Sequence, residues 1–381
     1  MGKQILILGA GFGGLAAANE LRKNLSAEHR IVVVERKNWF MMGLVKLWIL
    51  DGSRKLEESQ TPLAGLEAKG IKVLNDEVTK IDTTASTIET RDHGQIEFDY
   101  LIVALGAELV PDRVPGFVAN GYNLYDPLQV PRIREKLLSM NGGRVAITIM
   151  GMPYKCPPAP YEASIIISNI LAKRGARNSE IDVYSPAPIA MPVAGPQVSS
   201  TVVDTISQHG IRFNPTHKLK SVTETQLEFD NGVLKDYDLL IGIPPHRAPE
   251  VVRASGLTAG SDWISIDKHT TRTSIDKIFA VGDVTEIKIG ATALPKAGIF
   301  AEEQAKVAAQ QILNEIGIRP KEASFSGQGY CFMEVGNGRA GYLAANFYDK
   351  DGPSFRLDPP SEENYEKKLD FERTRIKDWL I

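Results

Sequence analysis

The sequence predicts an α/β protein with two Rossmann-like dinucleotide-binding domains and a C-terminal segment, because buried-strand patterns alternate with helical ones along most of its 381 residues. Residues 4–8 read QILIL and residues 144–150 read RVAITIM, and continuous apolar runs of this length are typical of buried parallel strands. At about 150 residues per domain, the length suggests two or three domains. We assign residues 1–110 and 250–318 to a first, discontinuous domain, 111–249 to a second, and 319–381 to the C-terminal segment.

A glycine-rich turn follows the first strand and predicts a dinucleotide site. Gly9, Gly11 and Gly14 form a G-x-G-x-x-G turn that opens a helix, and the next apolar strand ends at Glu35, 21 positions after Gly14. The glycines permit a tight turn, close approach of a pyrophosphate and close packing of helix on strand. The helix N-terminus attracts phosphates, and the Glu35 carboxylate accepts hydrogen bonds from ribose hydroxyls. The alternative is a purely structural glycine turn.

Composition narrows the classes of function and location. The formal net charge of −3 gives no reason to expect nucleic acid as a partner, and the six histidines show no metal-binding spacing such as H-E-x-x-H. The two cysteines form no C-x-x-C motif and no secreted disulfide framework. The sequence shows neither a signal-peptide pattern nor an apolar run of about 18 residues, so we expect cytoplasmic expression and no membrane-spanning helix.

Two later strands end in residues suited to the same cofactor. After Asp99 the sequence reads YLIVALGA, which includes Ala104 and Gly106, and residues 277–283 read KIFAVGD and end in Gly282 and Asp283. At this point the sequence resembles the flavin-dependent pyridine-nucleotide and disulfide oxidoreductase superfamily. The resemblance implies FAD as the cofactor, with Asp283 bound to its ribityl chain. The alternative for Asp283 is a strand-end aspartate that caps a helix.

Residues 294–302, LPKAGIFAE, open a long helix that runs toward Leu313. Free N–H groups at a helix N-terminus stabilise the negative charge that a reduced flavin acquires. Lys296 and Ala297 lie at this start and are candidate cofactor-binding residues. For Lys296 the alternative is a solvated surface lysine.

The second predicted domain lacks the features that hold a nicotinamide nucleotide. No G-x-G-x-x-G turn follows residues 144–150, and the next strand, residues 180–185, has no acidic residue at its tip. Cys156 lies here, just before a helical run over residues 161–173 with Pro160 near its first turn. A helix N-terminus lowers the pKa of a nearby thiol, so Cys156 is a candidate redox cysteine; the alternative is an inert buried thiol.

Three segments resemble those of the sulfide-oxidising flavoproteins, that is, the flavocytochrome c sulfide dehydrogenases and the sulfide:quinone oxidoreductases. They are PYKCPPAPYE at 153–162, IPPHRAP at 243–249 and GYCFME at 329–334. The resemblance implies that Cys156 and Cys331 face the flavin as a redox pair and that sulfide attacks their disulfide. A persulfide and a free thiolate result, and two electrons pass to FAD. Glu162 is a candidate for proton transfer near Cys156; the alternative is a first-turn partner of the helix dipole.

The chain departs from these families in two respects. A third active cysteine, common among quinone-linked members, is missing, which limits the subtype. Residues 39–43 read WFMMG, without the cysteine that tethers the flavin in flavocytochrome c, so we expect non-covalent FAD.

The electron acceptor is the least determined feature. Residues 361–381 predict a helix with an apolar stripe, formed by Tyr365, Leu369, Ile376, Trp379 and Leu380. By resemblance this tail docks on a membrane surface near a quinone; the alternative is packing on its own chain or on a second subunit in a homo-oligomer. Aromatic candidates for the quinone site are Phe300, Tyr330 and Phe332.

We therefore predict FAD-dependent oxidation of sulfide to persulfide or polysulfide sulfur, with a quinone as acceptor. Three alternatives stay open: a sulfide dehydrogenase that donates to a cytochrome c, a type II NADH:quinone dehydrogenase, and a flavin-binding redox sensor without turnover.

Overall fold

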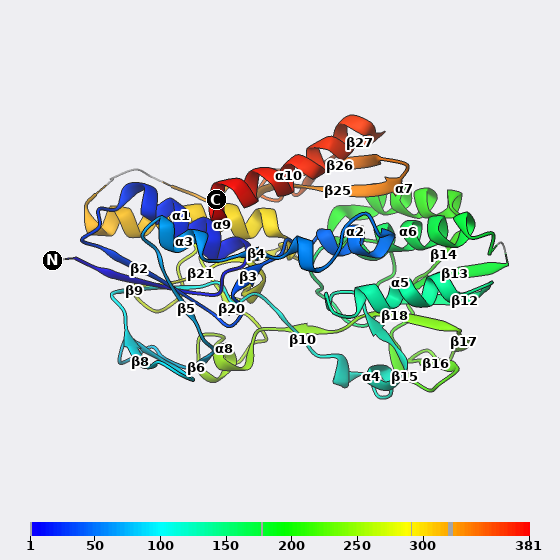
Figure 1. Cartoon of the computed structure of the whole chain (residues 1–381), viewed down its shortest axis with the longest axis horizontal. Coiled ribbons are helices and arrows are strands. Elements are labelled where there is room, and N and C mark those ends of the chain that lie inside the picture. Colours follow the sequence, from blue (N-terminus) through cyan, green and yellow to red (C-terminus); the bar gives the residue numbers. More distant parts are fainter. Residues whose placement is uncertain (1, 177, 291, 319–322) are drawn as a thin grey trace.

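The computed structural model describes residues 2–176, 178–290, 292–318 and 323–381. Two five-stranded parallel sheets lie side by side along the long axis of the molecule, and the C-terminal segment lies across one face of both (Figure 1). The structure is thus an α/β fold with two Rossmann-type sheets, as the sequence predicts.

The first sheet has the strand order β21-β9-β1-β2-β5. Its strands, in chain order, are β1 (Gln4–Leu8), β2 (Arg30–Glu35), β5 (Lys72–Asn75), β9 (Tyr100–Val103) and β21 (Ile278–Ala280). In the register of the sheet Leu8 pairs with Val34 and Val103, and Ala280 also pairs with Val103. The residues that follow these strands therefore meet at one edge, where parallel sheets of this type bind ligands.

The second sheet repeats this arrangement, with the order β11-β18-β12-β13-β14. Its strands are β11 (Tyr122–Asn123), β12 (Gly143–Ile149), β13 (Ser179–Tyr184), β14 (Ile211–Asn214) and β18 (Leu239–Ile243). The central run β18-β12-β13-β14 corresponds to β9-β1-β2-β5 of the first sheet, so the chain uses one design twice.

Each parallel sheet lies between a helical layer and an antiparallel meander. The helices are α1 (Phe12–Asn24) and α9 (Gly298–Ile316) on the first sheet, and α5 (Val130–Ser139), α6 (Ala159–Lys173) and α7 (Gly195–Gln208) on the second. The meanders are β6 (Val78–Asp82), β7 (Thr87–Thr90) and β8 (Gly94–Glu97) in the first half, and β15 (Leu219–Val222), β16 (Gln226–Phe229) and β17 (Leu234–Asp236) in the second. The helical layers of both halves share one continuous core, which includes Ile5 and Ile147, whereas each meander covers a core of its own.

Short elements join and cover these layers. The helices are α2 (Val45–Asp51), α3 (Gly65–Ala68), α4 (Phe117–Asn120) and α8 (Glu250–Ala254). The two-residue strand pairs are β3 (Trp39–Phe40) with β4 (Thr61–Pro62), β10 (Glu108–Leu109) with β19 (His246–Arg247), β20 (Ile264–Ser265) with β22 (Thr285–Glu286), and β23 (Lys288–Ile289) with β24 (Thr292–Ala293). Helix α2 follows the first two strands of the first sheet in sequence but packs against α5 and α6 of the second.

The C-terminal segment forms an antiparallel sheet followed by the last helix. Its elements are β25 (Gln328–Gly336), β26 (Arg339–Asn346), β27 (Ser354–Ser361) and α10 (Glu362–Leu380). The Ser361 side chain caps α10 by accepting a hydrogen bond from Asn364 N, as serine commonly does at a helix start. Of the helices in the described ranges, none is both long enough and apolar enough to cross a membrane.

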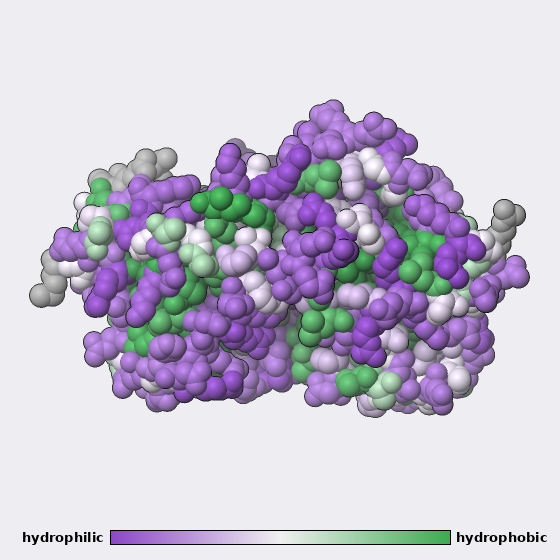
Figure 2. Space-filling model, in the orientation of Figure 1, coloured by the Kyte–Doolittle hydropathy of each residue, from purple (hydrophilic) through white to green (hydrophobic). Residues whose placement is uncertain are grey.

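Helix α10 packs along its apolar stripe on its own chain. Trp379 and Leu380 are buried, and Trp379 makes edge-on ring contacts with Phe12 and Phe40 at centroid distances of 5.6 and 6.2 Å. Of the stripe predicted to face lipid, only Tyr365, Leu369 and Ile376 keep partial exposure. Figure 2 shows mainly hydrophilic side chains over most of the outer side of this helix and a hydrophobic patch near the C-terminus. The packing agrees with the alternative interpretation of the tail, and Trp379 and Leu380 are not available to a membrane.

We expect Trp379→Ala to destabilise the protein by about 3–5 kcal/mol, because the substitution removes a buried ring that joins α10 to α1 and β3. Thermal unfolding followed by circular dichroism measures the loss. Ile381→Ala is the matched control, since Ile381 is 81% exposed and should leave the melting temperature unchanged. Equal melting temperatures for Trp379→Ala and the parent would show that α10 does not anchor there.

Candidate active site

The glycine turn after β1 leaves no room for side chains at two of the three glycines that define its G-x-G-x-x-G pattern. Gly9 has a φ of +96°, and a Cβ added there would lie 2.6 Å from the carbonyl oxygen of Ala104. A Cβ on Gly14 would lie 1.8 Å from the carbonyl oxygen of Gly9, so α1 packs directly on the turn. A Cβ on Gly11 would meet nothing within 4 Å, which leaves the backbone there open to a ligand.

The acidic residue at the end of β2 is held against this turn. Glu35 Oε2 accepts a hydrogen bond from Ala10 N at 2.9 Å, and Oε1 accepts one from Lys37 N at 3.1 Å. Each carboxylate oxygen has a second lone pair, so Glu35 can still accept ribose hydroxyls. Gly106, beyond β9, has a φ of +67° and open space beside it.

A second group of predicted residues lies where β21 and α9 meet. These residues line one small hollow, together with Phe300 and Gln304: Gly282, Asp283, Lys296 and Ala297. Burial raises the pKa of Asp283, while Lys155 and Lys296 lower it. The backbone of this hollow opens α9, since Ala297 is the residue before the first turn of that helix.

Lys296 is buried, so its interpretation as a solvated surface lysine is wrong. Its Nζ donates hydrogen bonds to the carbonyl oxygens of Asp283 and Thr285, at 2.8 and 3.0 Å, and lies 3.3 Å from the ring centroid of Trp263. Desolvation lowers the pKa of Lys296 to about 8. The ammonium is therefore engaged with the protein's own backbone at the start of α9.

These residues fit an FAD molecule laid across the edge of the first sheet. The open backbone at Gly11 and Gly106 and the fixed Glu35 carboxylate suit the adenosine and pyrophosphate end. Asp283 and the start of α9 suit the ribityl and flavin end. The corresponding edge of the second sheet differs, because a Cβ on Gly151 would lie 3.1 Å from Pro245 Cβ and the strand β13 leads into Ser185 rather than an acid.

Cys156 is tied to the hollow at the start of α9 by its backbone. Cys156 N donates a hydrogen bond to the carbonyl oxygen of Lys296 at 2.8 Å, and Tyr125 Oη donates to the carbonyl oxygens of Lys155 and Cys156 at 2.7 and 3.3 Å. Cys156 has a φ of +52°, a left-handed conformation that costs a non-glycine residue about 1–3 kcal/mol. The surrounding hydrogen bonds therefore hold this cysteine in a fixed and unfavourable backbone position.

The start of α6 does lower the pKa of Cys156, through the N–H of Ala159, but the net shift is opposite to the predicted one. Burial raises the pKa of the Cys156 thiol to about 12, and the Glu162 carboxylate adds to the rise. The carbonyl oxygen of Cys156 also accepts the N–H of Ala159 at the start of α6. This N–H lowers the pKa of the Cys156 thiol, but by less than burial raises it.

Cys331 lies on β25 and packs against the same core as Cys156. Both are free thiols. Burial raises the pKa of Cys331 above its ordinary range, and the charge of Cys156 is the next largest influence on it. Two residues from distant parts of the sequence thus share one electrostatic environment.

A buried ion cluster adjoins the two cysteines, which we call the Glu162–Lys368–Glu334 cluster after its members. Lys368 Nζ lies 2.8 Å from Glu162 Oε1 and 2.9 Å from Glu334 Oε2, and Glu162 Oε1 also accepts Glu334 N at 2.8 Å. All three residues are at most 4% exposed. Sequence reasoning singled out Glu162 but missed Lys368 and Glu334. The only signal was that Glu334 closes the segment that contains Cys331.

The three quinone candidates belong to two aromatic groups. Phe300 packs edge-on against Phe347 at 5.5 Å and lines the hollow beside Asp283. Tyr330 and Phe332 contact each other at a centroid distance of 5.8 Å and both contact Phe371 of α10. Phe300 and Phe332 are buried, so both side chains pack in the core whether or not they also contact a ligand.

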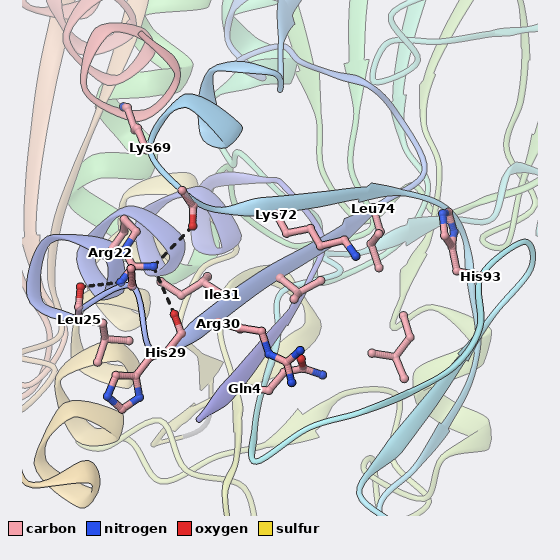
Figure 3. Close-up of a pocket in the computed structure, with 14 residues that line it drawn as sticks. Gln4, Arg22, Leu25, His29, Arg30, Ile31, Lys69, Lys72, Leu74 and His93 are labelled. Carbon is pink, nitrogen blue, oxygen red and sulfur yellow. Dashed lines mark hydrogen bonds between the residues drawn. The ribbon is translucent and has the colours of Figure 1, made fainter. Parts of the chain in front are cut away.

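A larger cavity, of about 550 Å³, lies at the opposite edge of the first sheet. Figure 3 shows Gln4, Arg30 and Lys72 beside it, which are the first residues of β1, β2 and β5. Cofactors of this fold bind at the carboxyl ends of the strands, so this cavity is not the dinucleotide site.

We expect Gly14→Ala to destabilise the protein by about 1–3 kcal/mol and to lower its flavin content, because the new methyl group overlaps the Gly9 carbonyl. Gly11→Ala is the matched variant, since it meets no protein atom and should change stability by less than about 0.5 kcal/mol. It should nevertheless lower the flavin content. Flavin absorbance per polypeptide and thermal unfolding measure the two effects, and full flavin occupancy of both variants would contradict this placement of the cofactor.

Comparison with known proteins places the chain in a family. The family model described as pyridine nucleotide-disulphide oxidoreductase matches residues 3–312. The sulfide-quinone reductase of Aquifex aeolicus is 25% identical over 364 residues, which cover 91% of this chain and 84% of that protein. A type II NADH:quinone oxidoreductase of Staphylococcus haemolyticus is 24% identical over 333 residues, which cover 82% of each chain.

Among solved structures, the crystal structure of the sulfide:quinone oxidoreductase of Aquifex aeolicus matches with a TM-score of 0.87 at 24% identity, covering 98% of this chain and 90% of that one. The match extends through the C-terminal segment and shows that the whole fold is shared. The chain therefore belongs to the pyridine nucleotide-disulphide oxidoreductase family, as a flavin-dependent oxidoreductase similar to the sulfide:quinone oxidoreductases.

Proposed function

We propose that this protein oxidises sulfide to persulfide or polysulfide sulfur, with Cys156 and Cys331 as a redox pair, non-covalently bound FAD as the electron carrier and a quinone as the acceptor. The observation that carries the proposal is the hydrogen bond from Cys156 N to the carbonyl oxygen of Lys296. This bond ties the loop after β12, which carries Cys156, to the start of α9, where we propose that the flavin end of the cofactor lies.

The sulfur chemistry follows from the two thiols. HS⁻ attacks one sulfur of the oxidised Cys156–Cys331 pair, the S–S bond breaks, and a persulfide forms while the other cysteine leaves as a thiolate. A second sulfide releases the persulfide sulfur and leaves both cysteines reduced. Bound FAD would accept two electrons from the two reduced cysteines, whose disulfide then re-forms with release of their protons.

The burial of the two cysteines gives Glu162 a part in this step. A thiolate whose conjugate thiol has a raised pKa is a poor leaving group, and burial raises the pKa of both cysteines. A proton delivered to the leaving sulfur removes this obstacle. Burial also raises the pKa of Glu162, which lets this carboxyl hold a proton at higher pH than an exposed glutamate. We therefore assign proton exchange with the sulfur atoms to Glu162.

Quinone as acceptor is supported by the sulfide-quinone reductase relative and by the aromatic residues at the flavin end. Phe300 lines the hollow beside Asp283, and Tyr330 and Phe332 lie on the strand that carries Cys331. Aromatic faces of this kind suit a planar ring. Non-covalent binding of FAD is supported by the cysteine count, because both cysteines of the chain are assigned to the sulfur site.

Anaerobic addition of sulfide to the purified protein should bleach the flavin rapidly, and the stopped-flow absorbance of the flavin measures the rate. Cys156→Ala and Cys331→Ala should each abolish rapid bleaching, because neither variant can form the disulfide that sulfide attacks. Complete reduction of both variants by dithionite is the control for intact cofactor. Bleaching of both variants at the parent rate would contradict the proposed role of the two cysteines.

NADH should leave the flavin oxidised, because the edge of the second sheet lacks a glycine turn and an acidic strand end. The measurement is the same stopped-flow trace with NADH in place of sulfide. Bleaching by NADH and not by sulfide would replace the proposed function with that of a type II NADH:quinone oxidoreductase.

A further inference from the structure

We infer that Lys368 of α10 is a positioning residue for sulfide oxidation: with Glu334 it fixes Glu162 beside the two cysteines and keeps this carboxylate ready to exchange a proton with sulfur. The inference rests on the proposed function and adds to it a requirement for the C-terminal helix. Lys368 touches neither sulfur nor cofactor in this account and acts through Glu162.

The Glu162–Lys368–Glu334 cluster joins three elements that are distant in sequence. Glu162 lies in the first turn of α6, Glu334 on β25 with Cys331, and Lys368 in the second turn of α10. Trp48 of α2 covers the cluster, since its Nε1 donates to Glu334 Oε2 at 3.2 Å and its ring lies 5.8 Å from Lys368 Nζ. The cluster is complete only when α10 is docked.

The orientation of Glu162 leaves one oxygen available. Oε1 accepts both Lys368 Nζ and Glu334 N, whereas Oε2 accepts no hydrogen bond within the described residues. An ionised carboxylate has about four acceptor positions, so Oε2 is the atom free to take or give a proton. Two donors fix this orientation, and without Lys368 only the N–H of Glu334 remains.

The charge balance of the cluster depends on Lys368. Two carboxylates and one ammonium leave a formal charge of −1, and Lys368 is the only cation in ion-pair contact with Glu162 or Glu334 within the described residues. Lys46 of α2 brings a positive charge that acts on Cys156. The other titratable groups that face the cluster bring none: Cys156, Cys331, Tyr125, Asp51 and Tyr365. Replacement of Lys368 by an apolar residue would leave two buried carboxylates beside two thiols.

The sign of the effect on Glu162 follows from these contacts. Burial raises the pKa of Glu162, and Lys368 opposes this rise through its charge and its hydrogen bond. Without Lys368 the pKa of Glu162 rises further, because burial and the charge of Glu334 both favour the protonated form and only the N–H of Glu334 still opposes them. A carboxyl with a higher pKa is a weaker acid and gives its proton to the leaving sulfur less readily. Reduction of the flavin by sulfide should therefore be slower, and its pH dependence should shift upward.

A purely structural role for Lys368 makes a different prediction. Helix α10 is also held by Arg375, whose Nε lies 2.6 Å from Glu302 Oε2, and by Arg54, whose Nη2 lies 3.2 Å from Glu372 Oε2. If Lys368 only anchored the helix, its loss would lower stability without moving the pH dependence of sulfide oxidation. The pH profile therefore separates the two roles.

The test compares Lys368→Met, Lys368→Arg and Lys367→Met as FAD-loaded full-length proteins in anaerobic stopped flow over a range of pH. We expect Lys368→Met to slow flavin reduction by sulfide by about 100-fold at neutral pH and to shift its pH dependence upward. Lys368→Arg should restore much of the rate, because it keeps the charge. Lys367→Met is the control, since Lys367 is exposed and pairs with Glu363; it should match the parent. A parent-like rate and pH profile for Lys368→Met would overturn the inference.

A second measurement does not depend on sulfide. Infrared difference spectroscopy on the oxidised protein follows the C=O stretch of a protonated buried carboxyl during a pH titration, and Glu162→Gln assigns the band. The band should appear at higher pH in Lys368→Met than in the parent, and an unchanged titration would overturn the inference. If the parent titrates as expected but sulfide never bleaches its flavin, the proposed function fails while the role of Lys368 in setting Glu162 stands.

A neutral triple variant covers the case in which Lys368→Met does not fold. Glu162→Gln, Glu334→Gln and Lys368→Met together remove every charge of the cluster, which avoids an uncompensated buried carboxylate. This variant should fold, bind FAD and lose rapid reduction by sulfide. Reduction of the triple variant at the parent rate would contradict the inference.

Discussion

One backbone contact, between the residues before Cys156 and the start of α9, joins the carboxyl edges of the two sheets. Lys155 pairs with Lys296 as an isolated parallel bridge, and Cys156 N donates to the carbonyl oxygen of Lys296. Because a backbone hydrogen bond fixes both distance and direction, it sets Cys156 beside the flavin end of the first sheet. The strained φ of Cys156 is maintained by this contact and by Tyr125. The proposed sulfur chemistry depends on this junction, because it connects Cys156 to the residues at the start of α9.

The C-terminal segment packs on the rest of the chain through buried charged residues in addition to apolar contacts. Burying three charged groups costs several kcal/mol per ion before their attraction is counted, and a buried ion pair is weak evidence for stability. An apolar cluster of the same volume would hold α10 at least as well. The Glu162–Lys368–Glu334 cluster is better explained by the proposed sulfur chemistry, which needs a carboxyl of defined charge near the two cysteines.

The two halves show how one layered design serves two purposes. In the first half the glycine turn and Glu35 keep the edge of the sheet open to a dinucleotide. In the second half the equivalent edge is occupied by Pro245 beside Gly151 and by the loop that carries Cys156. The same strand order therefore leaves an edge open to a cofactor in one case and supports the loop that carries Cys156 in the other.

Local patterns in the sequence determine most of the elements and the cofactor end of the site. Continuous apolar runs predict the parallel strands, and the predicted helix over residues 161–173 is observed as α6, Ala159–Lys173. The glycine turn with Glu35 is readable because all its parts lie within one strand–helix–strand unit, where sequence distance fixes spatial distance. Ser361 and the stripe that follows it predict α10.

The environment of each side chain is decided by tertiary structure, because burial and charge come from segments far apart in the chain. The sequence suggests a lowered pKa for Cys156, whereas burial and Glu162 raise it. It suggests a lipid-facing tail, whereas Trp379 packs on Phe12 and Phe40. Lys368 and Glu334 look like ordinary charged residues until α10 and β25 bring them to Glu162. The sequence by itself thus specifies which strands and turns form. Only the folded arrangement specifies which charged side chains are buried near the two cysteines.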